Sequence, residues 1–160
     1  MFEKNKGITL VALVITIIVL LILAGVSISL VVGDNGVLTQ SKNSSDSTKI
    51  GQMQEALQIA MSDVQTAYFG NYALNASVSF DSMVNPATLY ASLKNQGYTL
   101  LNSSKASCEN STVNFSTSFV DYYISDGTNA IKVQIKKQST NSTALTTHYD
   151  DSVEFVAVNN

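Results

Sequence analysis

The chain has 160 residues, a formal net charge of −3 at pH 7, nine lysines and no arginine. Proteins that bind nucleic acid usually carry clustered Lys and Arg on a basic domain, so this composition argues against direct binding of nucleic acid. The single cysteine, Cys108, excludes a disulfide within the chain. Beyond any membrane segment, the length leaves room for one globular domain.

The most distinctive stretch is Gly7–Val32, which contains no charged residue and no proline. As a helix it would be about 38 Å long, enough to cross a hydrocarbon core of ~30 Å. Lys4 and Lys6 precede it. An excess of Lys on the short N-terminal side predicts that this side stays in the cytoplasm and that residues after Val32 face outward.

Three interpretations of this stretch compete: a secretory signal peptide, a plain membrane anchor, and a helix that later packs against copies of itself. A signal peptide needs an apolar region of only ~7–15 residues, and this one is longer. Small residues recur at a spacing of four, in the pairs Ala12/Thr16 and Gly25/Ser29. Such spacing lets helix backbones approach closely, which favours the third interpretation.

The junction before the helix reads Lys4-Asn5-Lys6-Gly7, followed by Ile8-Thr9-Leu10-Val11. Here the chain resembles the type IV pilin and pseudopilin family, whose members carry a short basic leader ending in Gly and then a hydrophobic helix. The resemblance covers roughly the first fifth of the chain. It implies that a prepilin peptidase cuts between Gly7 and Ile8 and methylates the new amine of Ile8. Glycine suits such a cut because it lacks a Cβ and lets the protease approach.

The resemblance also implies a structural subunit of an extracellular filament, a homo-oligomer assembled by a cytoplasmic ATPase and a platform protein. The precursor would lie in the cytoplasmic membrane and the product at the cell surface. Roughly 18 aliphatic side chains make release of the helix into water cost on the order of 30 kcal/mol, so lipid must be exchanged for neighbouring helices. The residues expected in the filament core are Leu10, Ala12, Thr16, Gly25 and Ser29. Many pilins from bacteria with an outer membrane carry a disulfide in the C-terminal region, so the resemblance together with the single Cys108 suggests a single-membrane, Gram-positive bacterium.

One position departs from the family: Ala12 stands where most members carry a Glu, five residues into the mature chain. By resemblance, that carboxylate pairs with the N-terminal amine of a neighbour. Its loss favours an alternative, a minor pilin or pseudopilin of a secretion or DNA-uptake system. A further alternative is an uncleaved, single-pass surface protein whose outer domain binds a ligand.

The expected organisation has four parts. They are a basic leader at 1–7, a hydrophobic helix at 8–32, a flexible joint at 33–47 and a globular head at 48–160. The joint is predicted from Gly33-Asp34-Asn35-Gly36, because glycine weakens a helix by ~1 kcal/mol relative to Ala, and from the polar run 41–47.

The head begins with an amphipathic pattern at helical spacing, which Asp46 or Ser47 can cap. Its apolar stripe comprises Ile50, Met53, Leu57, Met61, Val64 and Tyr68. A further helix is predicted from Asn85 as N-cap and Pro86 as first residue, ending at Gly97, with Leu89, Tyr90 and Leu93 facing inward.

From Tyr98 the apolar period changes to two, which predicts strands. The expected strands cover 98–101, 120–124, 131–135 and 153–157, with turns at 126–129 and 138–143. We therefore predict an α+β fold of the type IV pilin kind, in which a long N-terminal helix packs its amphipathic half on a small antiparallel sheet.

No arrangement of residues indicates catalysis, a cofactor or a metal. His148, the only histidine, is expected on the surface of a polar loop without a second ligand. Asp150 and Asp151 are expected to be a solvated pair, and Cys108 a free, partly buried thiol. The sequence therefore predicts a structural protein and no enzyme.

Overall fold

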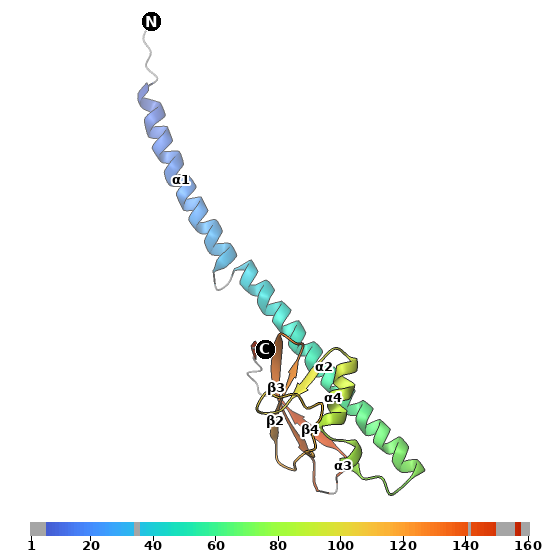
Figure 1. Cartoon of the computed structure of the whole chain (residues 1–160). Helices are drawn as coiled ribbons and strands as arrows, with labels where there is room; N and C mark the ends of the chain where they lie inside the picture. The colour runs from blue at the N-terminus through green and yellow to red at the C-terminus, as the bar shows by residue number, and fades with distance from the viewer. Residues whose placement is uncertain (1–5, 34–35, 141, 150–155, 158–160) are drawn as a thin grey trace. The chain divides into compact units, whose positions relative to one another are not determined.

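The computed structural model of the chain describes residues 6–33, 36–140, 142–149 and 156–157. Its contacts divide the chain into two compact units, Met1–Ser47 and Thr48–Asn160, and each is described by itself. Figure 1 shows the elements in the order in which they follow along the chain.

The first unit contains helix α1, Lys6–Val32, with 27 residues and no proline. Leu is a good helix former, whereas the many Ile and Val residues are slightly less favourable in water. In lipid this order matters little, since a helix pairs its interior backbone amides within the segment. The helical hydrogen bonds extend to Gly33, whose N–H donates to the carbonyl of Ser29 at 3.0 Å.

A corner built on two glycines separates α1 from the next helix. A Cβ on Gly33 would lie 2.5 Å from the carbonyl oxygen of Ser29, and a Cβ on Gly36 would lie 2.6 Å from that of Val31. Glycine is required at both positions because any side chain would collide with backbone. The predicted break in the helix is therefore confirmed, and close backbone approach is its physical cause.

Helix α2, Val37–Leu74, has 38 residues. The prediction that this helix begins at Asp46 or Ser47 is wrong, and the segment expected as a flexible joint, 33–47, is helical from Val37 on. Residues 37–50 contain no glycine or proline. Ser, Thr and Asn cost at most about 0.7 kcal/mol each relative to Ala, so a polar run does not stop a helix already formed.

The described part of the head adds two short helices and five strands. They are α3 (Phe80–Met83), α4 (Pro86–Asn95), β1 (Thr99–Leu101), β2 (Val120–Ser125), β3 (Asn129–Lys137), β4 (Leu145–His148) and β5 (Val156–Ala157). The sheet has the order β1-β2-β3-β4, β5 also pairs with β3, and all pairings are antiparallel. The fold is α+β.

The hairpin of β2 and β3 forms the centre of the sheet and confirms the predicted alternation. Tyr122 lies opposite Val133 and Ile124 opposite Ile131, and all four are buried. The turn between the strands is tightened by Asp126, whose carboxylate accepts the backbone N–H groups of residues 128 and 129 at 2.9 and 2.7 Å. Such local bonds are the reason for the preference of turns for Asp.

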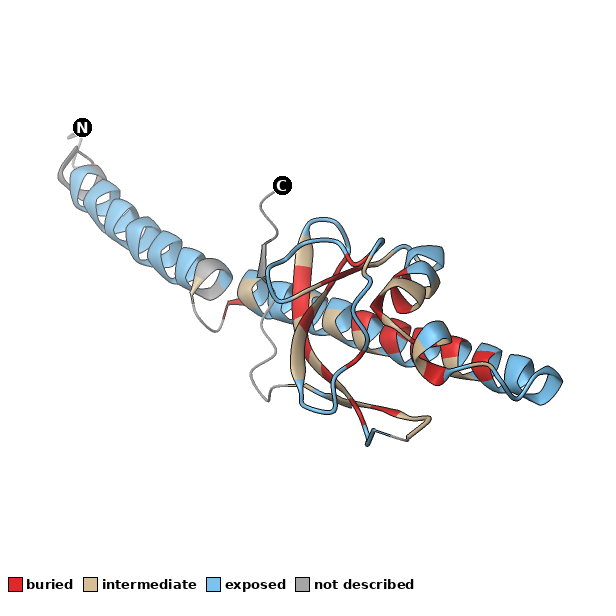
Figure 2. Ribbon diagram, turned by 60° about the horizontal axis from the view of Figure 1, so that its bottom comes forward, coloured by how far each residue is buried: buried red, intermediate tan, exposed pale blue. Residues whose placement is uncertain are grey.

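The amphipathic stripe of α2 supplies the other half of the core, as predicted. Its buried members are Met53, Ala56, Leu57, Ala60, Met61, Val64 and Tyr68, and Ile50 lies partly buried against the same cluster. Within the head, α2 lies along the sheet with its buried residues turned toward it (Figure 2). The apolar stripe of α2 is therefore covered by the chain itself, whereas Ile59, Phe69 and Leu74 on the rest of the helix stay exposed.

Helix α4 begins and ends where the sequence predicts. Asn85 accepts the N–H of Thr88 at 3.0 Å, and the Thr88 hydroxyl accepts the N–H of Asn85 at 3.1 Å, a reciprocal capping box ahead of Pro86. At the other end Gly97 has a φ of 86°, and the N–H of Tyr98 reaches back to the carbonyl of Leu93. This Schellman motif explains why glycine follows the helix.

One helix and one strand of the head were not predicted from the sequence. Helix α3 has only four residues, too few for a helical pattern. Strand β4, whose sequence is LTTH, contains one apolar residue and forms because the long strand β3 offers it an edge at 134–137. His148 is therefore the last residue of a strand, whereas it was expected in a loop. Of the predicted last strand, only Val156–Ala157 lies within the described residues.

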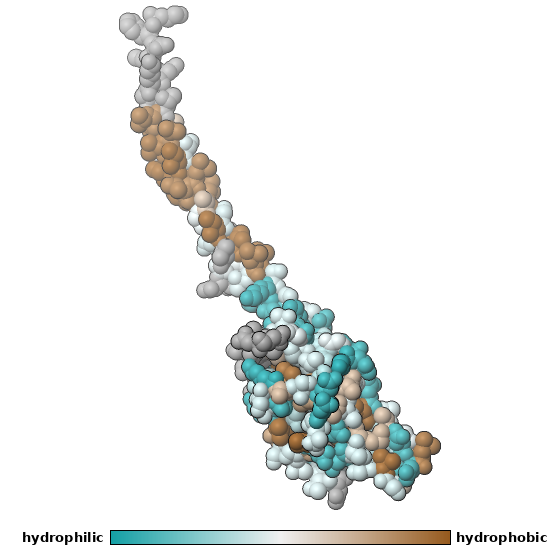
Figure 3. Space-filling model, viewed as in Figure 1, coloured by the Kyte–Doolittle hydropathy of each residue, from teal (hydrophilic) through white to brown (hydrophobic). Residues whose placement is uncertain are grey.

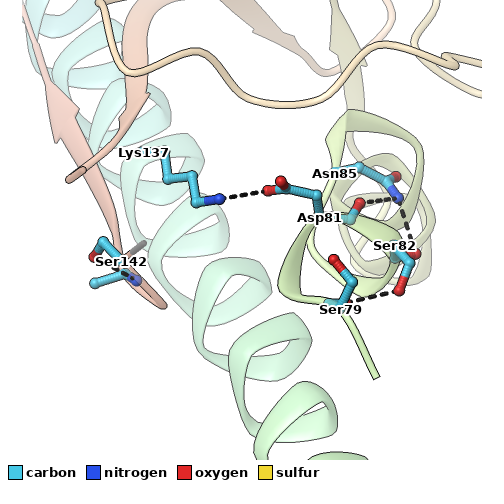
Figure 4. A network of polar contacts seen from close by, with 7 residues as sticks. Ser79, Asp81, Ser82, Asn85, Lys137 and Ser142 are labelled. Carbon is cyan, nitrogen blue, oxygen red and sulfur yellow. Dashed lines mark hydrogen bonds and ion pairs between the residues drawn. The ribbon is translucent and has the colours of Figure 1, made fainter. Parts of the chain in front are cut away.

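The end of β3 is tied to α3 by a largely buried ion pair. Lys137 Nζ lies 2.7 Å from a carboxylate oxygen of Asp81 and 5.3 Å from the centre of the Phe80 ring. The Lys137 side chain is only 8% exposed, so this carboxylate is what makes its burial tolerable. Figure 4 shows the pair beside Asn85, whose amide binds the carbonyls of Asp81 and Ser82.

Candidate functional site: the exposed apolar helix

Helix α1 exposes apolar side chains on every side. Fifteen large aliphatic residues between Leu10 and Val31 are 44–68% exposed. The stretch Leu10–Ser29 contains 20 residues and no part of it is buried in the chain. At 1.5 Å per residue it rises ~30 Å, the thickness of a bilayer core. Among the described residues, α1 is the one helix long and apolar enough to span a membrane; Figure 3 shows its hydrophobic surface.

Hydroxyl groups in α1 bond to the helix that carries them. Thr16 Oγ1 donates to the carbonyl of Leu13 at 2.8 Å, and Ser27 Oγ donates to the carbonyl of Leu23 at 2.7 Å. Both bonds are local, so these hydroxyls need no water. This arrangement keeps the cost of placing the helix in an apolar surrounding low.

The small residues predicted to pack in a filament core lie on two faces of α1, not on one. Ala12 and Thr16 are about 40° apart around the helix, and so are Gly25 and Ser29, at 100° per residue. From Thr16 to Gly25 the rotation is about 180°. The described side chains are exposed, and a Cβ added to Gly25 would meet nothing within 4 Å. Each pair could therefore receive a different neighbouring helix.

The predicted cleavage junction lies at the start of α1. Gly7 and Ile8 belong to the first turn of the helix, which begins at Lys6. The first four N–H groups of a helix have no partner within it, and such turns unwind readily. A protease that needs an extended strand would therefore have little helix to open at this bond.

The remaining candidate groups lie in the head. Cys108 is 2% exposed and lies at the base of an open hollow of about 370 Å³ that residues 107–113 and Asn102 line. Burial raises the pKa of its thiol to about 11, so the thiol stays protonated and is a poor nucleophile at neutral pH. The predicted free, buried thiol is confirmed.

No group of three or more His, Cys, Asp and Glu side chains that could hold a metal occurs among the described residues. His148 is exposed at the end of β4, with its ring centre 5.9 Å from that of Phe119. Asp34, Asp150 and Asp151 lie outside the described residues. Among the residues that the structure describes, neither His148 nor Cys108 belongs to a group that could hold a metal.

Pairs of cationic and aromatic side chains in the head were not predicted from the sequence, and two of them lie on the same side of the hairpin of β2 and β3. Lys136 Nζ lies 4.5 Å from the ring centre of Phe119, and Lys105 Nζ lies 5.6 Å from that of Tyr123. The alternation of β2 and β3 predicts part of this arrangement, since it places Tyr123 and Lys136 on the same face of the hairpin. The position of Lys105 depends on a loop conformation that has no periodic signal.

Comparison with known proteins adds no assignment to this picture. No protein-family model matches the chain, and no curated protein and no solved structure matches it either. The feature that most needs an explanation is therefore α1, an apolar helix that the chain itself leaves uncovered.

Proposed function

We propose that the chain is the structural subunit of an extracellular filament similar to a type IV pilus. Its precursor is held in the cytoplasmic membrane by α1, with the head outside. Assembly then transfers α1 from lipid into a bundle of the same helices from other subunits. The chain carries out no reaction itself.

The observation that supports this proposal most is that the head has a hydrophobic core of its own, whereas the apolar side chains of α1 are exposed. The core of the head consists of residues between Met53 and Leu145, and it requires no side chain from α1. The aliphatic side chains of α1 are worth at least ~1.5 kcal/mol each when removed from water. A partner outside the chain must therefore cover α1, and both lipid and further copies of α1 can do so.

The distribution of small residues over two faces of α1 supports a bundle over an isolated pair of helices. Close approach at Ala12 and Thr16 on one face leaves Gly25 and Ser29 available on the other. A subunit with two different contact faces is able to join its neighbours head to tail, and such contacts form an open polymer when the rotation between subunits does not close a ring.

The resemblance of the junction to prepilins supplies the partners. A prepilin peptidase cuts between Gly7 and Ile8 and methylates the amine of Ile8, and an ATPase and a platform protein extract the subunit from the membrane. Ala12 favours a second candidate within this proposal, a minor pilin or pseudopilin, because α1 has no carboxylate to pair with a neighbour's amine.

The test is mass spectrometry of the sheared extracellular fraction and of the membranes from the same cells. We expect chains that begin at Ile8 in sheared filaments and a longer precursor in the membranes. An intact N-terminus confined to membranes would instead support an uncleaved anchor. The number of copies per filament separates a main subunit from a minor one.

Gly7→Leu tests the cut site directly. The added side chain should block the approach of the protease, so the precursor accumulates in the membrane and filaments are lost. The matched control is Gly51→Leu, at an exposed glycine of α2 around which a Cβ would meet nothing within 4 Å. Normal filaments from Gly7→Leu would contradict the proposal.

A further inference from the structure

The face of the sheet that turns away from the core carries an unusual set of side chains. Along β3, Ile131, Val133 and Ile135 are fully buried, so the residues between them point to the opposite face. We call this the outer sheet face, and it comprises Asp121, Tyr123, Lys132, Gln134 and Lys136, with Lys105 and Phe119 at its ends.

Each end of the outer sheet face presents an ammonium group next to an aromatic ring. One end has Lys136 over Phe119, which is 41% exposed, and the other has Lys105 over Tyr123. Neither lysine forms an ion pair with a carboxylate in the part of the chain that the structure describes. Both ammonium groups therefore keep hydrogen-bond donors for an anion.

Lys105 reaches its position through an unfavourable backbone conformation. Its φ is 61°, and Asn102 stabilises the loop by accepting the N–H groups of Ser104 and Ala106 at 2.9 and 3.0 Å. For a lysine this conformation costs roughly 1–2 kcal/mol, which Gly would avoid. Such strain is frequently found where a side chain has a functional task.

The middle of the outer sheet face is polar, and Asp121 carries a negative charge there. Lys132 pairs with Asp121 at 2.9 Å, and the amide of Gln134 donates to the same carboxylate at 2.8 Å. Tyr123 lies opposite Lys132, which is four residues from Lys136. At ~3.3 Å per residue, about 13 Å therefore separates the two ends of this face.

We propose that the outer sheet face binds an extended acidic polysaccharide whose carboxylates are widely spaced. The two lysines bind one carboxylate at each end of the face, the two rings stack on the apolar faces of sugars, and Gln134 and Asp121 bind hydroxyl groups between them. This inference concerns the head alone and does not depend on the filament.

The charge pattern favours such a glycan over single-stranded nucleic acid. A nucleic acid carries a phosphate on every nucleotide, so a strand that joins the two ends would place phosphate near Asp121. A glycan with one carboxylate per disaccharide leaves neutral hydroxyls at this point. The acidic chain, with a net charge of −3, also lacks the general attraction for dense polyanions.

The test measures binding of the full-length chain in detergent micelles to immobilised hyaluronan, which has one carboxylate per disaccharide, and to neutral dextran and an oligothymidylate. We expect hyaluronan to bind best, and more weakly as salt rises. Joint substitution of Lys105→Gln and Lys136→Gln should weaken binding by about tenfold or more, since each lysine forms charge-assisted hydrogen bonds.

The matched control is Lys94→Gln. Lys94 also lies over a ring, that of Tyr90 at 5.5 Å, but it pairs with Glu109 at 3.0 Å and lies on α4 away from the outer sheet face. The Lys94→Gln variant should bind hyaluronan as well as the unsubstituted chain does. A second pair of variants tests the ring: Phe119→Ala should weaken binding, whereas Phe119→Tyr should retain it.

Three results would overturn the inference: hyaluronan binding no better than dextran, an equal loss with Lys94→Gln, or tighter binding of the oligothymidylate through the same lysines. Filament yield from the Lys105/Lys136 variant is measured separately and should be unchanged. If sheared filaments from cells with the unsubstituted chain did not contain this chain, that result would count against the proposed function and not against this binding face.

Discussion

Helices α1 and α2 differ in how their apolar side chains are distributed and covered. Helix α1 is apolar on all sides, and its large side chains that the structure describes are 44% or more exposed. In the head, α2 is apolar along one stripe, and that stripe is buried beneath the sheet of the same chain. A stripe can be covered from within the chain, whereas a helix that is apolar all round needs lipid or other helices.

The largest expected difference between the two helices appears when one leucine in each is replaced by alanine. Leu57→Ala should lower the free energy of unfolding of the head by about 2–5 kcal/mol, because Leu57 is fully buried and a cavity remains. Leu20→Ala, at a residue 64% exposed, should leave it unchanged. Urea unfolding of the full-length chain in detergent micelles, followed by tyrosine fluorescence, measures both. A similar loss from Leu20→Ala would mean that the head depends on α1.

The next effect concerns charge, which α1 lacks after Lys6 and which the described part of the head buries at Lys137, next to the carboxylate of Asp81. Asp81→Asn leaves the ammonium of Lys137 buried without a carboxylate, and we expect a loss of about 1–3 kcal/mol, moderated because Asp81 is partly exposed. Lys137→Met in the same background removes the unpaired charge and should restore most of this stability. If the double variant were no better than Asp81→Asn, the unpaired ammonium would not be the cause.

Much of this fold could be predicted because the deciding signals are local. The stripe of α2, the capping box of Asn85 and the alternation of β3 each depend on residues close together in the sequence. The start of α2 at Val37 could not be found in this way, because the polar run 41–47 has no apolar period although it is helical. Strand β4 depends on the free edge of β3, and the position of Lys105 depends on a loop. These last features are set by tertiary contacts that no periodicity records.

A smaller effect should come from the glycines of the two helices. A Cβ on Gly51 of α2 or on Gly25 of α1 would meet nothing within 4 Å. Gly51→Ala should therefore stabilise the head by about 0.5–1 kcal/mol, the difference in helix propensity. Gly25→Ala should not affect unfolding of the head, but it should reduce filament yield, because neighbouring helices could approach less closely. Undiminished filaments from Gly25→Ala and from Gly25→Leu would remove Gly25 from the packing surface.

The smallest expected effect is a dependence on pH that belongs to the head alone, because α1 has no charged side chain after Lys6. Burial raises the pKa of the Cys108 thiol from 9.0 to about 11. Below pH 9 the thiol is protonated in both states and contributes no difference. Between pH 9 and 11 the unfolded chain loses this proton while the folded chain keeps it, so the free energy of unfolding falls.

We expect a fall below about 1 kcal/mol over the first pH unit of this window, since the hollow above Cys108 is open to water. Cys108→Ala should remove this slope, and the comparison uses slopes because the substitution also leaves a small cavity. Measurement is best confined to pH 9–10, because burial raises the pKa of Tyr122 from 10.0 to about 12 and adds a second fall at higher pH. An equal slope in Cys108→Ala would show that the thiol ionises as easily in the folded head as in the unfolded chain.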